Sequence, residues 1–447
     1  MQPYAADAPA LAMMAPWRSP HRPAADTGVG VRGAFRECEF EGLDGAPCAM
    51  ARAMMKVALL IPLIPPDFSG AGKRGWRMAV ALRDRGFDVV VLTFSDVPPE
   101  RDGIRVVVLR RWAAHRRSGA RGPFQRVRTF IAALATVSEA SVALRRERPD
   151  IAHQIGCDIA PQLLGVAALL VRVPVMAEVT LMGSDDPLTV RRAVAGALRF
   201  RLMRRYGRLV CISPRLLEAA RSTPLDPDRL IVIGNDVDAE RFVPVDEAGK
   251  AALRRQLLLP DDGRVVISVG AVSRRKGMLE LAEGFVQHVL PWLPHATLIV
   301  AGPTDRDDAE YGSMLKGLAE RPEVEGRVRI VGEVQDAAQW LQAADVFAFA
   351  SREEGFGTVL VEAMAVGLPV VARRIPGVSE FILGATPGTE IVETDEQLGP
   401  AIVRALQVAD DRETRHALRE RAQTHFAQEV IIDQYIDQYM ALAKAQQ

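Results

Sequence analysis

The stretch SREEGFGTVLVEAMAVGLPVVARRIPGVSE, residues 351–380, decides the fold, because it links two units of secondary structure through a glycine-rich turn. It begins where an apolar strand, VFAFAS, ends. Gly355 and Gly357 let the backbone turn tightly and approach a ligand, and Thr358 is placed to cap the helix that follows. Gly367 ends that helix before the next strand, PVVA. This order of strand, turn, helix and strand predicts an α/β unit with a parallel sheet.

The same turn carries two carboxylates at a useful spacing. Glu354 precedes the glycines, and Glu362 lies four residues into the helix, about 6 Å further along its axis. The helix start also offers free N–H groups and a positive dipole end to an anion or a hydroxylated ring. Two carboxylates at this offset are suited to hold two sugar rings of one ligand. The alternative is a solvated acidic pair beside a helix start.

The α/β alternation occurs twice along the chain, with a break near residue 246. KVALLIPLI and RVVISVGAVS open the two halves, and such continuous apolar runs are typical of strands buried on both faces. We therefore predict an α/β protein with two Rossmann-like doubly wound parallel-sheet domains facing across a cleft. The predicted segments are a disordered or spurious N-terminal extension (1–53), a first domain (54–246), a second domain (247–425) and a C-terminal helix packing towards the first domain (426–447).

Charge divides the two halves. Residues 54–246 carry 30 Lys+Arg against 20 Asp+Glu, whereas residues 247–447 carry 21 against 30. Only the first half therefore suits an anionic partner. The four cysteines show no CxxC spacing, which disfavours a structural zinc site or a disulfide framework and fits a reducing cytoplasm. We also expect no signal peptide.

A basic loop follows the strand that opens the second half. In SVGAVSRRKGMLEL, the residues Arg274, Arg275 and Lys276 precede Gly277, which opens a helix. Cations in such a loop can neutralise a diphosphate leaving group as its charge develops. The alternative is an ordinary basic turn.

A third glycine-rich loop follows the first strand. Gly70, Gly72 and Gly75 match the dinucleotide fingerprint G-x-G-x-x-G, and Asp96 is placed as the acid for a ribose. An NAD(P)-dependent oxidoreductase is therefore an alternative function. The loop is not a P-loop, because the position that requires the first glycine is Asp67.

Taken together, these motifs resemble the retaining family-4 glycosyltransferases of the GT-B fold. Glu354 and Glu362 match the E-x₇-E pair of that family. Its later motif residues are matched by Gly367, Pro369, Gly377 and Glu380. The first-domain G-G pair of the family aligns with Ser69 and Gly70, and its G-R-L-x-x-x-K-G motif aligns with Gly270, Ala271, Lys276 and Gly277. IVIGNDVDAERFVP resembles the segment before the interdomain linker.

The resemblance implies transfer of a sugar from a nucleotide-diphosphate sugar to a saccharide or lipid-linked acceptor, with retention and by front-face displacement. Lys276 and Glu354 would be the catalytic residues, and no catalytic metal or cofactor is expected. The implied donor-binding residues are Ser69, Gly70, Gly270, Arg275, Gly355, Phe356, Gly357, Thr358 and Glu362. Ser69 and Ala271 replace the usual Gly and Arg of the family, so a non-catalytic GT-B-like partner protein is a further alternative.

Three further features of the sequence each have a functional interpretation and a purely structural one. Asp185 and Asp186 are placed on the acceptor side, or else form an exposed acidic turn. Residues 305–308 imitate a metal-binding D-x-D motif, but a solvated loop is the favoured interpretation. His153 ends a strand and is either a base or a hydrogen-bonded histidine of the core.

Two arginine-rich runs, residues 110–128 and 191–208, contain no acidic residue. Both lie in the basic half, which favours contact with an anionic membrane surface or a phosphorylated acceptor over a merely solvated helix face. We expect a cytoplasmic protein, peripheral at the inner face of the membrane. Nucleic acid is not expected as a partner, since no recognition module accompanies the charge.

Overall fold

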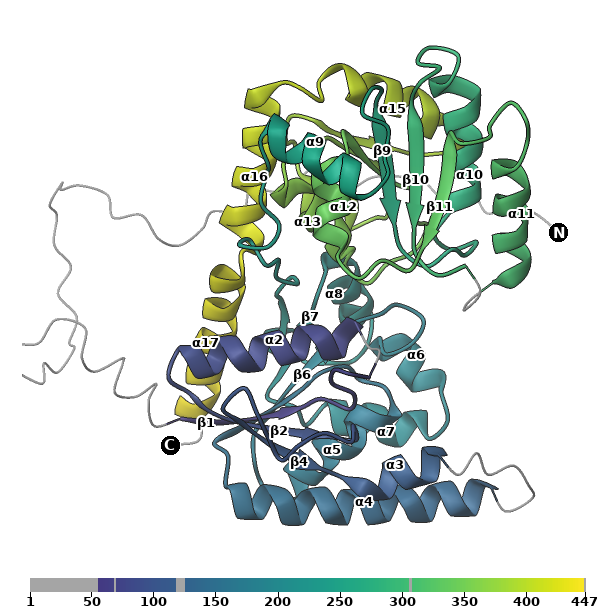
Figure 1. Ribbon diagram of the computed structural model, residues 1–447. Coiled ribbons are helices and arrows are strands. Elements are labelled where there is room, and N and C mark those ends of the chain that lie inside the picture. Colours follow the sequence, from purple (N-terminus) through teal and green to yellow (C-terminus); the bar gives the residue numbers. More distant parts are fainter. Residues whose placement is uncertain (1–54, 68–69, 118–124, 305–307, 446–447) are drawn as a thin grey trace, which may run out of the picture. The chain divides into compact units, whose positions relative to one another are not determined.

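The computed structural model describes residues 55–67, 70–117, 125–304 and 308–445 (Figure 1). The predicted extension and Ser69 lie outside these residues.

Within the described residues, the first sheet has the strand order β3-β4-β2-β1-β5-β6-β7-β8. Neighbouring strands are parallel except for the antiparallel pair β3 and β4. Alternate residues of β1 belong to two different core clusters, which shows that the strand is buried on both faces. The strands are β1 (Lys56–Leu60), β2 (Asp88–Thr93), β3 (Glu100–Arg101), β4 (Ile104–Val108), β5 (Ile151–Gln154), β6 (Val175–Val179), β7 (Arg208–Cys211) and β8 (Leu230–Val232).

Helices cover both faces of this sheet (Figure 1). Apolar residues of α2 (Gly70–Asp84) and α17 (Gln428–Lys444) share one core cluster with β1. Residues of α4 (Gln125–Glu147) and α5 (Ile159–Leu170) belong to the cluster on the other face. The remaining helices of this part are α3 (Arg110–Arg117), α6 (Pro187–Arg192), α7 (Gly196–Met203), α8 (Pro214–Arg221) and the short η1 (Pro227–Arg229).

The second sheet is wholly parallel, with the order β11-β10-β9-β12-β13-β14 in the described residues. Its strands are β9 (Val265–Val269), β10 (Thr297–Ala301), β11 (Val328–Gly332), β12 (Val346–Phe349), β13 (Val370–Arg373) and β14 (Thr389–Val392). Its helices are α9 (Glu247–Gln256), α10 (Met278–Gly284), η2 (Phe285–Val289), α11 (Ala309–Ala319), α12 (Ala337–Ala343), α13 (Thr358–Ala365), α14 (Ser379–Leu383), η3 (Asp395–Gln397), α15 (Leu398–Gln407) and α16 (Arg412–Phe426).

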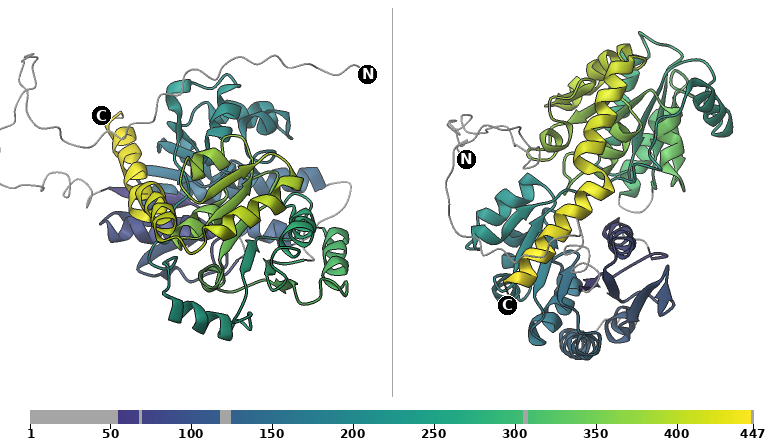
Figure 2. Two further views of the ribbon diagram at one scale, coloured as in Figure 1. Left: turned by 90° about the horizontal axis from the view of Figure 1, so that it is seen from above. Right: turned by 90° about the vertical axis from the view of Figure 1, so that its left-hand side faces the viewer.

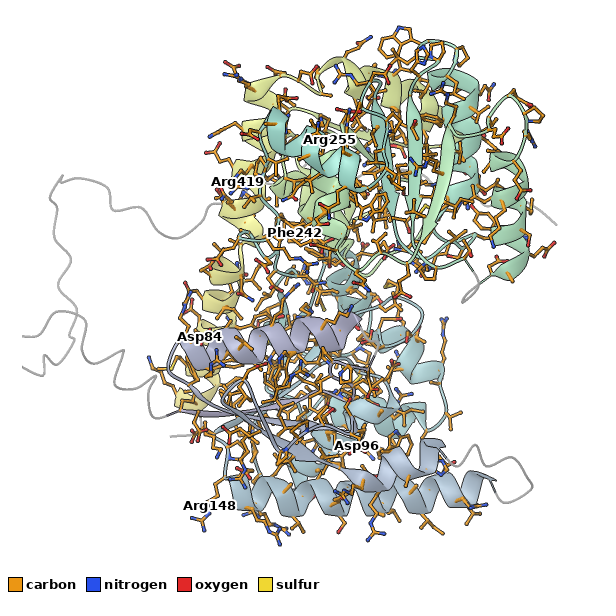
Figure 3. All side chains as sticks on the ribbon, viewed as in Figure 1. Asp84, Asp96, Arg148, Phe242, Arg255 and Arg419 are labelled. Atoms are coloured by element: carbon orange, nitrogen blue, oxygen red, sulfur yellow. The ribbon has the colours of Figure 1, made fainter. Side chains whose placement is uncertain are left out.

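The chain passes twice between the two sheets, and the two passages touch. The backbone N–H of Val237 donates to the carbonyl of Phe426, 2.8 Å away, and Val237 forms an isolated bridge with Ala427. Helices α16 and α17 follow one another directly at this point (Figure 2). Further along the first passage, Arg419 of α16 donates to the carbonyl of Phe242 (Figure 3).

A buried ionic network joins α17 to the first sheet. Glu178 of β6 is fully buried, and both of its carboxylate oxygens accept hydrogen bonds from the guanidinium of Arg74 on α2. Tyr435 of α17 donates to the same carboxylate at 2.8 Å. Burial alone raises the pKa of Glu178, but the charge of Arg74 outweighs it and holds that pKa well below its usual range. An ionised glutamate is thus kept inside a strand that is otherwise apolar.

His153 of β5 completes the network. Its Nε2 atom lies 3.1 Å from the Glu178 carboxylate, and its Nδ1 atom is 2.7 Å from the hydroxyl of Tyr439. The histidine is fully buried, which confirms the interpretation of a hydrogen-bonded core residue.

We predict that Glu178→Gln lowers the free energy of unfolding by about 3–5 kcal/mol, because it leaves the Arg74 guanidinium buried without a counter-charge. Urea denaturation followed by circular dichroism measures this loss. The matched control is Glu390→Gln, which removes the partner of Arg404 in an exposed pair and is expected to cost about 0–1 kcal/mol. Equal losses in the two variants would contradict the prediction.

Candidate active site

The glycine turn lies between β12 and α13. Gly357 is the N-cap residue of α13 and has a left-handed backbone (φ 91°), a conformation that glycine adopts without strain. The prediction that Thr358 caps this helix is wrong, because Thr358 is already its first helical residue. Its hydroxyl instead accepts a hydrogen bond from the side-chain amide of Asn235, 3.1 Å away.

Gly355 is required for close packing in this turn. A Cβ atom at this position would overlap the carbonyl oxygen of Thr180, in the loop that follows β6 of the first sheet. The neighbouring Phe356 side chain is buried against Phe381 and Phe426. Only the backbone of Phe356 is therefore left for a ligand in this turn.

Three polar side chains converge on the Glu354 carboxylate. The ammonium of Lys276 donates to it, and the guanidinium of Arg275 lies 3.3 Å from the same oxygen. The hydroxyl of Ser351 donates to that oxygen at 2.9 Å. The side chains of Lys276 and Glu354 are 15% and 13% exposed, so this ion pair is shielded from most of the solvent. The structure thus brings together the two residues that the sequence proposes as catalytic.

The two arginines of the basic loop have different partners. Arg274 pairs with Asp308, 3.2 Å away, and with Glu310, 3.5 Å away. Arg275 instead donates to the carbonyl of Glu353 at 2.6 Å, on the side of the glycine turn. Of the two arginines near Ala271, Arg275 is therefore the one placed beside the predicted donor site.

Gly270 lies directly beneath Lys276. Its backbone φ is 150°, and a Cβ atom there would lie 3.4 Å from the Lys276 side chain. Lys276 also lies over the ring of Phe349, with 5.9 Å between its Nζ atom and the ring centroid. The lysine is therefore held in one direction by the backbone, by an aromatic face and by Glu354.

Glu362 is partly buried on α13 and makes no hydrogen bond or ion pair with another described residue. Burial raises the pKa of Glu362 to about 7, against the opposing charges of Arg77 and Arg241 and with a small contribution from Asp236. Arg77 comes from α2, and Asp236 lies in the passage between the sheets, where the two form an ion pair of 3.2 Å. Sequence reasoning missed Arg77 as a neighbour of Glu362, because nothing in the sequence relates α2 to α13.

Two family models match the chain on either side of residue 246. Residues 249–425 match "Glycosyl transferases group 1", and residues 69–236 match a "Glycosyl transferase 4-like domain". The chain belongs to the group 1 glycosyl transferases. The matched ranges contain every described residue of the site.

Curated relatives agree with this family. A D-inositol 3-phosphate glycosyltransferase from Jonesia denitrificans is 31% identical over 45% of this chain and 48% of its own length. The lipopolysaccharide core biosynthesis glycosyltransferase LpsE of Rhizobium meliloti is 33% identical over 51% of this chain and 62% of its own length. In the first of these matches, and in similar ones from Corynebacterium urealyticum and Xylanimonas cellulosilytica, the chain spans about half the length of the relative.

Solved structures share the two-domain GT-B fold. Anabaena HepE in complex with UDP superposes with a TM-score of 0.69 and 21% identity, covering 87% of this chain and all of that chain. A sucrose-phosphate synthase from Thermosynechococcus elongatus gives a TM-score of 0.68 at 23% identity, covering 88% of this chain and all of that one. The expected fold class of two Rossmann-like parallel-sheet domains is confirmed.

The first glycine loop of this group 1 glycosyl transferase differs from a dinucleotide fingerprint. Gly70 is the first residue of α2, so Gly72 and Gly75 lie within the helix. Strand β1 ends at Leu60, well before these glycines, whereas the fingerprint needs a tight turn directly after its strand. The loop therefore lacks the geometry that an oxidoreductase would use.

Asp185 and Asp186 are buried, so the alternative of an exposed acidic turn is wrong. The carboxylate of Asp185 accepts backbone N–H groups of Cys157, Thr180 and Leu181. Asp186 caps α6 through the N–H of Thr189. Both carboxylates thus shape the loop that faces Gly355, and their acceptor-side role stays a prediction.

Asp308, the described residue of the D-x-D-like segment, has a structural role. Asp308 caps α11 by accepting the N–H of Tyr311, and it pairs with Arg274. Residues 305–307 lie outside the described part of the chain.

We predict that Glu362→Gln removes a pH dependence of stability. The ordinary pKa is 4.5 and the folded value is about 7, so the folded chain holds this proton longer than the unfolded chain. Stability therefore falls as pH rises from about 4.5 to about 7, and the loss is complete above that range. The Tm of Glu362→Gln minus the Tm of the parent should therefore increase between pH 5 and pH 8. The exposed control Glu420→Gln should track the parent, and a Tm difference for Glu362→Gln that does not change with pH would contradict the assignment.

Proposed function

We propose that this chain transfers a sugar from a nucleotide-diphosphate sugar to an acceptor, with retention of the anomeric configuration. The observation that carries the proposal is the convergence of Lys276 and Arg275 on Glu354 at the glycine turn. Two cations and one carboxylate, of which Lys276 and Glu354 are mostly withdrawn from water, match a ligand that carries a diphosphate beside a hydroxylated ring.

Donor binding would exchange the partners within this cluster. In the structure, Glu354 is the counter-charge of both cations. Diphosphate oxygens would take over Lys276 and Arg275, since a phosphate offers them more negative charge than one carboxylate. Glu354 would then accept hydroxyls of the donor sugar, beside the amides of Gly355 and Gly357. The site residues thus have a role in both states, and their assignments remain our proposal.

Glu362 would hold the ribose. Its carboxylate has acceptor capacity to spare, because no described residue donates to it. Two ribose hydroxyls donating to it would favour the ionised form and lower its pKa from about 7. The energetic cost of ionising a buried carboxyl would thereby be offset by the ligand itself.

The chemical step would rest on electrostatic stabilisation. Negative charge grows on the diphosphate as the bond to the sugar breaks, and Lys276 lies in a shielded position to stabilise it. We propose that the acceptor attacks from the face that the diphosphate leaves, with no covalent sugar–enzyme intermediate. We further propose that these cations, rather than a metal ion, neutralise the leaving group.

The relatives support this class of donor and acceptor. HepE has been solved with UDP and with UDP-glucose, and curated relatives include glycosyltransferases of inositol phosphate and of lipopolysaccharide core. We propose a saccharide or lipid-linked glycan as the acceptor and polysaccharide biosynthesis as the setting. The basic first domain would face an anionic membrane surface from the cytoplasm.

We predict that Lys276→Ala lowers kcat by about 10²–10³-fold, the effect of removing one donor to a developing oxyanion. Glu354→Gln should lower kcat strongly as well, because an amide replaces the carboxylate that would accept hydroxyls of the donor sugar. Arg255→Ala, which changes an exposed residue of α9, is the control and should leave turnover unchanged (Figure 3). Near-normal turnover of both site variants, with Tm values like that of the parent, would contradict the proposed catalytic roles of Lys276 and Glu354.

A panel of UDP-, GDP- and ADP-sugars, with NAD(P) as a rival ligand, identifies the donor by thermal shift. A ligand at 100 times its Kd adds about 2.7 kcal/mol to stability, which shifts the Tm measurably. We expect one nucleotide sugar to shift the Tm and then to be slowly hydrolysed. A shift by NAD(P) alone would favour the oxidoreductase, and nucleotide-sugar binding without any hydrolysis or transfer would favour a non-catalytic partner protein.

A further inference from the structure

Helix α4 carries an exposed apolar stripe. Val127, Phe130, Ile131 and Leu134 are 55%, 64%, 59% and 55% exposed. They are spaced three and four residues apart, so they lie together on one face of the helix. Four large apolar side chains in contact with water are unfavourable unless a partner covers them, and such contiguous patches mark interaction sites.

The acidic residues of α4 are turned away from this stripe. Glu139 accepts the backbone N–H groups of Arg110 and Arg111 at the start of α3, each at 3.1 Å. Glu147 pairs with Lys56 at 3.1 Å and with Arg105 at 2.9 Å. Both carboxylates are therefore engaged inside the domain, and they give the exposed face no negative charge.

Arginines accompany the stripe. Arg128 is exposed and lies between Val127 and Phe130 in the sequence. Arg145 and Arg146 are exposed in the last turn of the helix, and Arg148 is exposed just after its end (Figure 3 labels Arg148). None of these four forms an ion pair with a described acidic side chain. The exposed face of α4 thus combines apolar side chains with unbalanced positive charge, which suits an anionic surface with an apolar interior.

The inner side of α4 fixes its orientation. By length and composition alone, the segment Val127–Glu147 is apolar enough to cross a membrane. However, Ala140 and Leu144 are buried in the core cluster of the first sheet, and Thr136 is buried beside them. A helix that packs into its own domain along one side cannot be surrounded by lipid, so only its outer side is free.

We infer that α4 docks this chain on an anionic bilayer, lying in the membrane plane with Val127, Phe130, Ile131 and Leu134 inserted at the boundary between headgroups and acyl chains. The exposed arginines of α4 and of its C-terminal end bind the lipid phosphates. This deepens the proposed function, since it brings a lipid-linked acceptor to the first domain. The docking itself needs neither donor nor catalysis.

Vesicle sedimentation with the full chain tests the docking. Vesicles of phosphatidylcholine with phosphatidylglycerol should bind the parent, and the double variant Phe130→Glu/Ile131→Glu should bind at least about tenfold more weakly, because it puts charge where apolar side chains insert. The control is Met314→Glu, which changes a 48%-exposed apolar residue of α11 and should bind like the parent. Equal binding by all three proteins would overturn the inference.

Insertion is distinguished from surface attraction by Phe130→Trp. Its fluorescence should be quenched by lipids brominated on the acyl chains, beyond the quenching of the parent's own tryptophans, and binding should survive in part at high salt. Absence of that extra quenching would overturn insertion. If light scattering shows a dimer of the parent and a monomer of the Glu double variant, the stripe would instead bind a second copy of the chain.

These outcomes are separate from those of the proposed function. Donor hydrolysis measured without vesicles tests the glycosyl transfer site and should be unchanged in the double variant. Docking without any hydrolysis would leave the inference standing and remove the enzymatic proposal.

Discussion

The charge balance around the Glu354 carboxylate is the constraint on which the site depends. The carboxylate comes from the loop after β12, and the cations Lys276 and Arg275 come from the loop after β9. Strands β9 and β12 are parallel neighbours, so their carboxyl ends meet at one edge of the sheet. Adjacent strands thus bring together groups that lie 78 residues apart in the chain. The ion pair of Lys276 with Glu354 keeps each of these two poorly solvated charges next to an opposite charge.

The first domain approaches the glycine turn closely through its backbone. The loop after β6 reaches Gly355 so closely that a side chain there would overlap the Thr180 carbonyl. That loop is shaped by Asp185, and the strand before it is anchored by the ion pair of Glu178 with Arg74. Arg74 lies on α2, close behind Gly70, and Tyr435 of α17 bonds to the same Glu178. The buried network therefore fixes α2, β6 and the C-terminal helix together just beneath the loops that face the donor site.

Local sequence was a good guide where a motif is continuous in the chain. The glycine turn, the helix of Glu362 and the basic loop were each predicted from consecutive residues, and the structure has them at those positions. Errors arose where a side chain finds a distant partner. Thr358 was expected to cap its helix but bonds to Asn235. An exposed turn was one of the two interpretations of Asp185, which is buried among backbone amides. One missed feature did leave a signal, since Glu178 stands alone in an otherwise apolar strand.

By itself, the sequence determined the two parallel-sheet domains and the chemistry of the donor loops. Both follow from hydrophobic periodicity and from glycine spacing, which act over a few neighbouring residues. Only the tertiary structure decided which arginine lies beside the glycine turn, that no described residue donates to Glu362, and which side of α4 is exposed. Those outcomes depend on burial and on contacts between residues far apart in the chain, and such contacts exist only once the sheets and helices have packed.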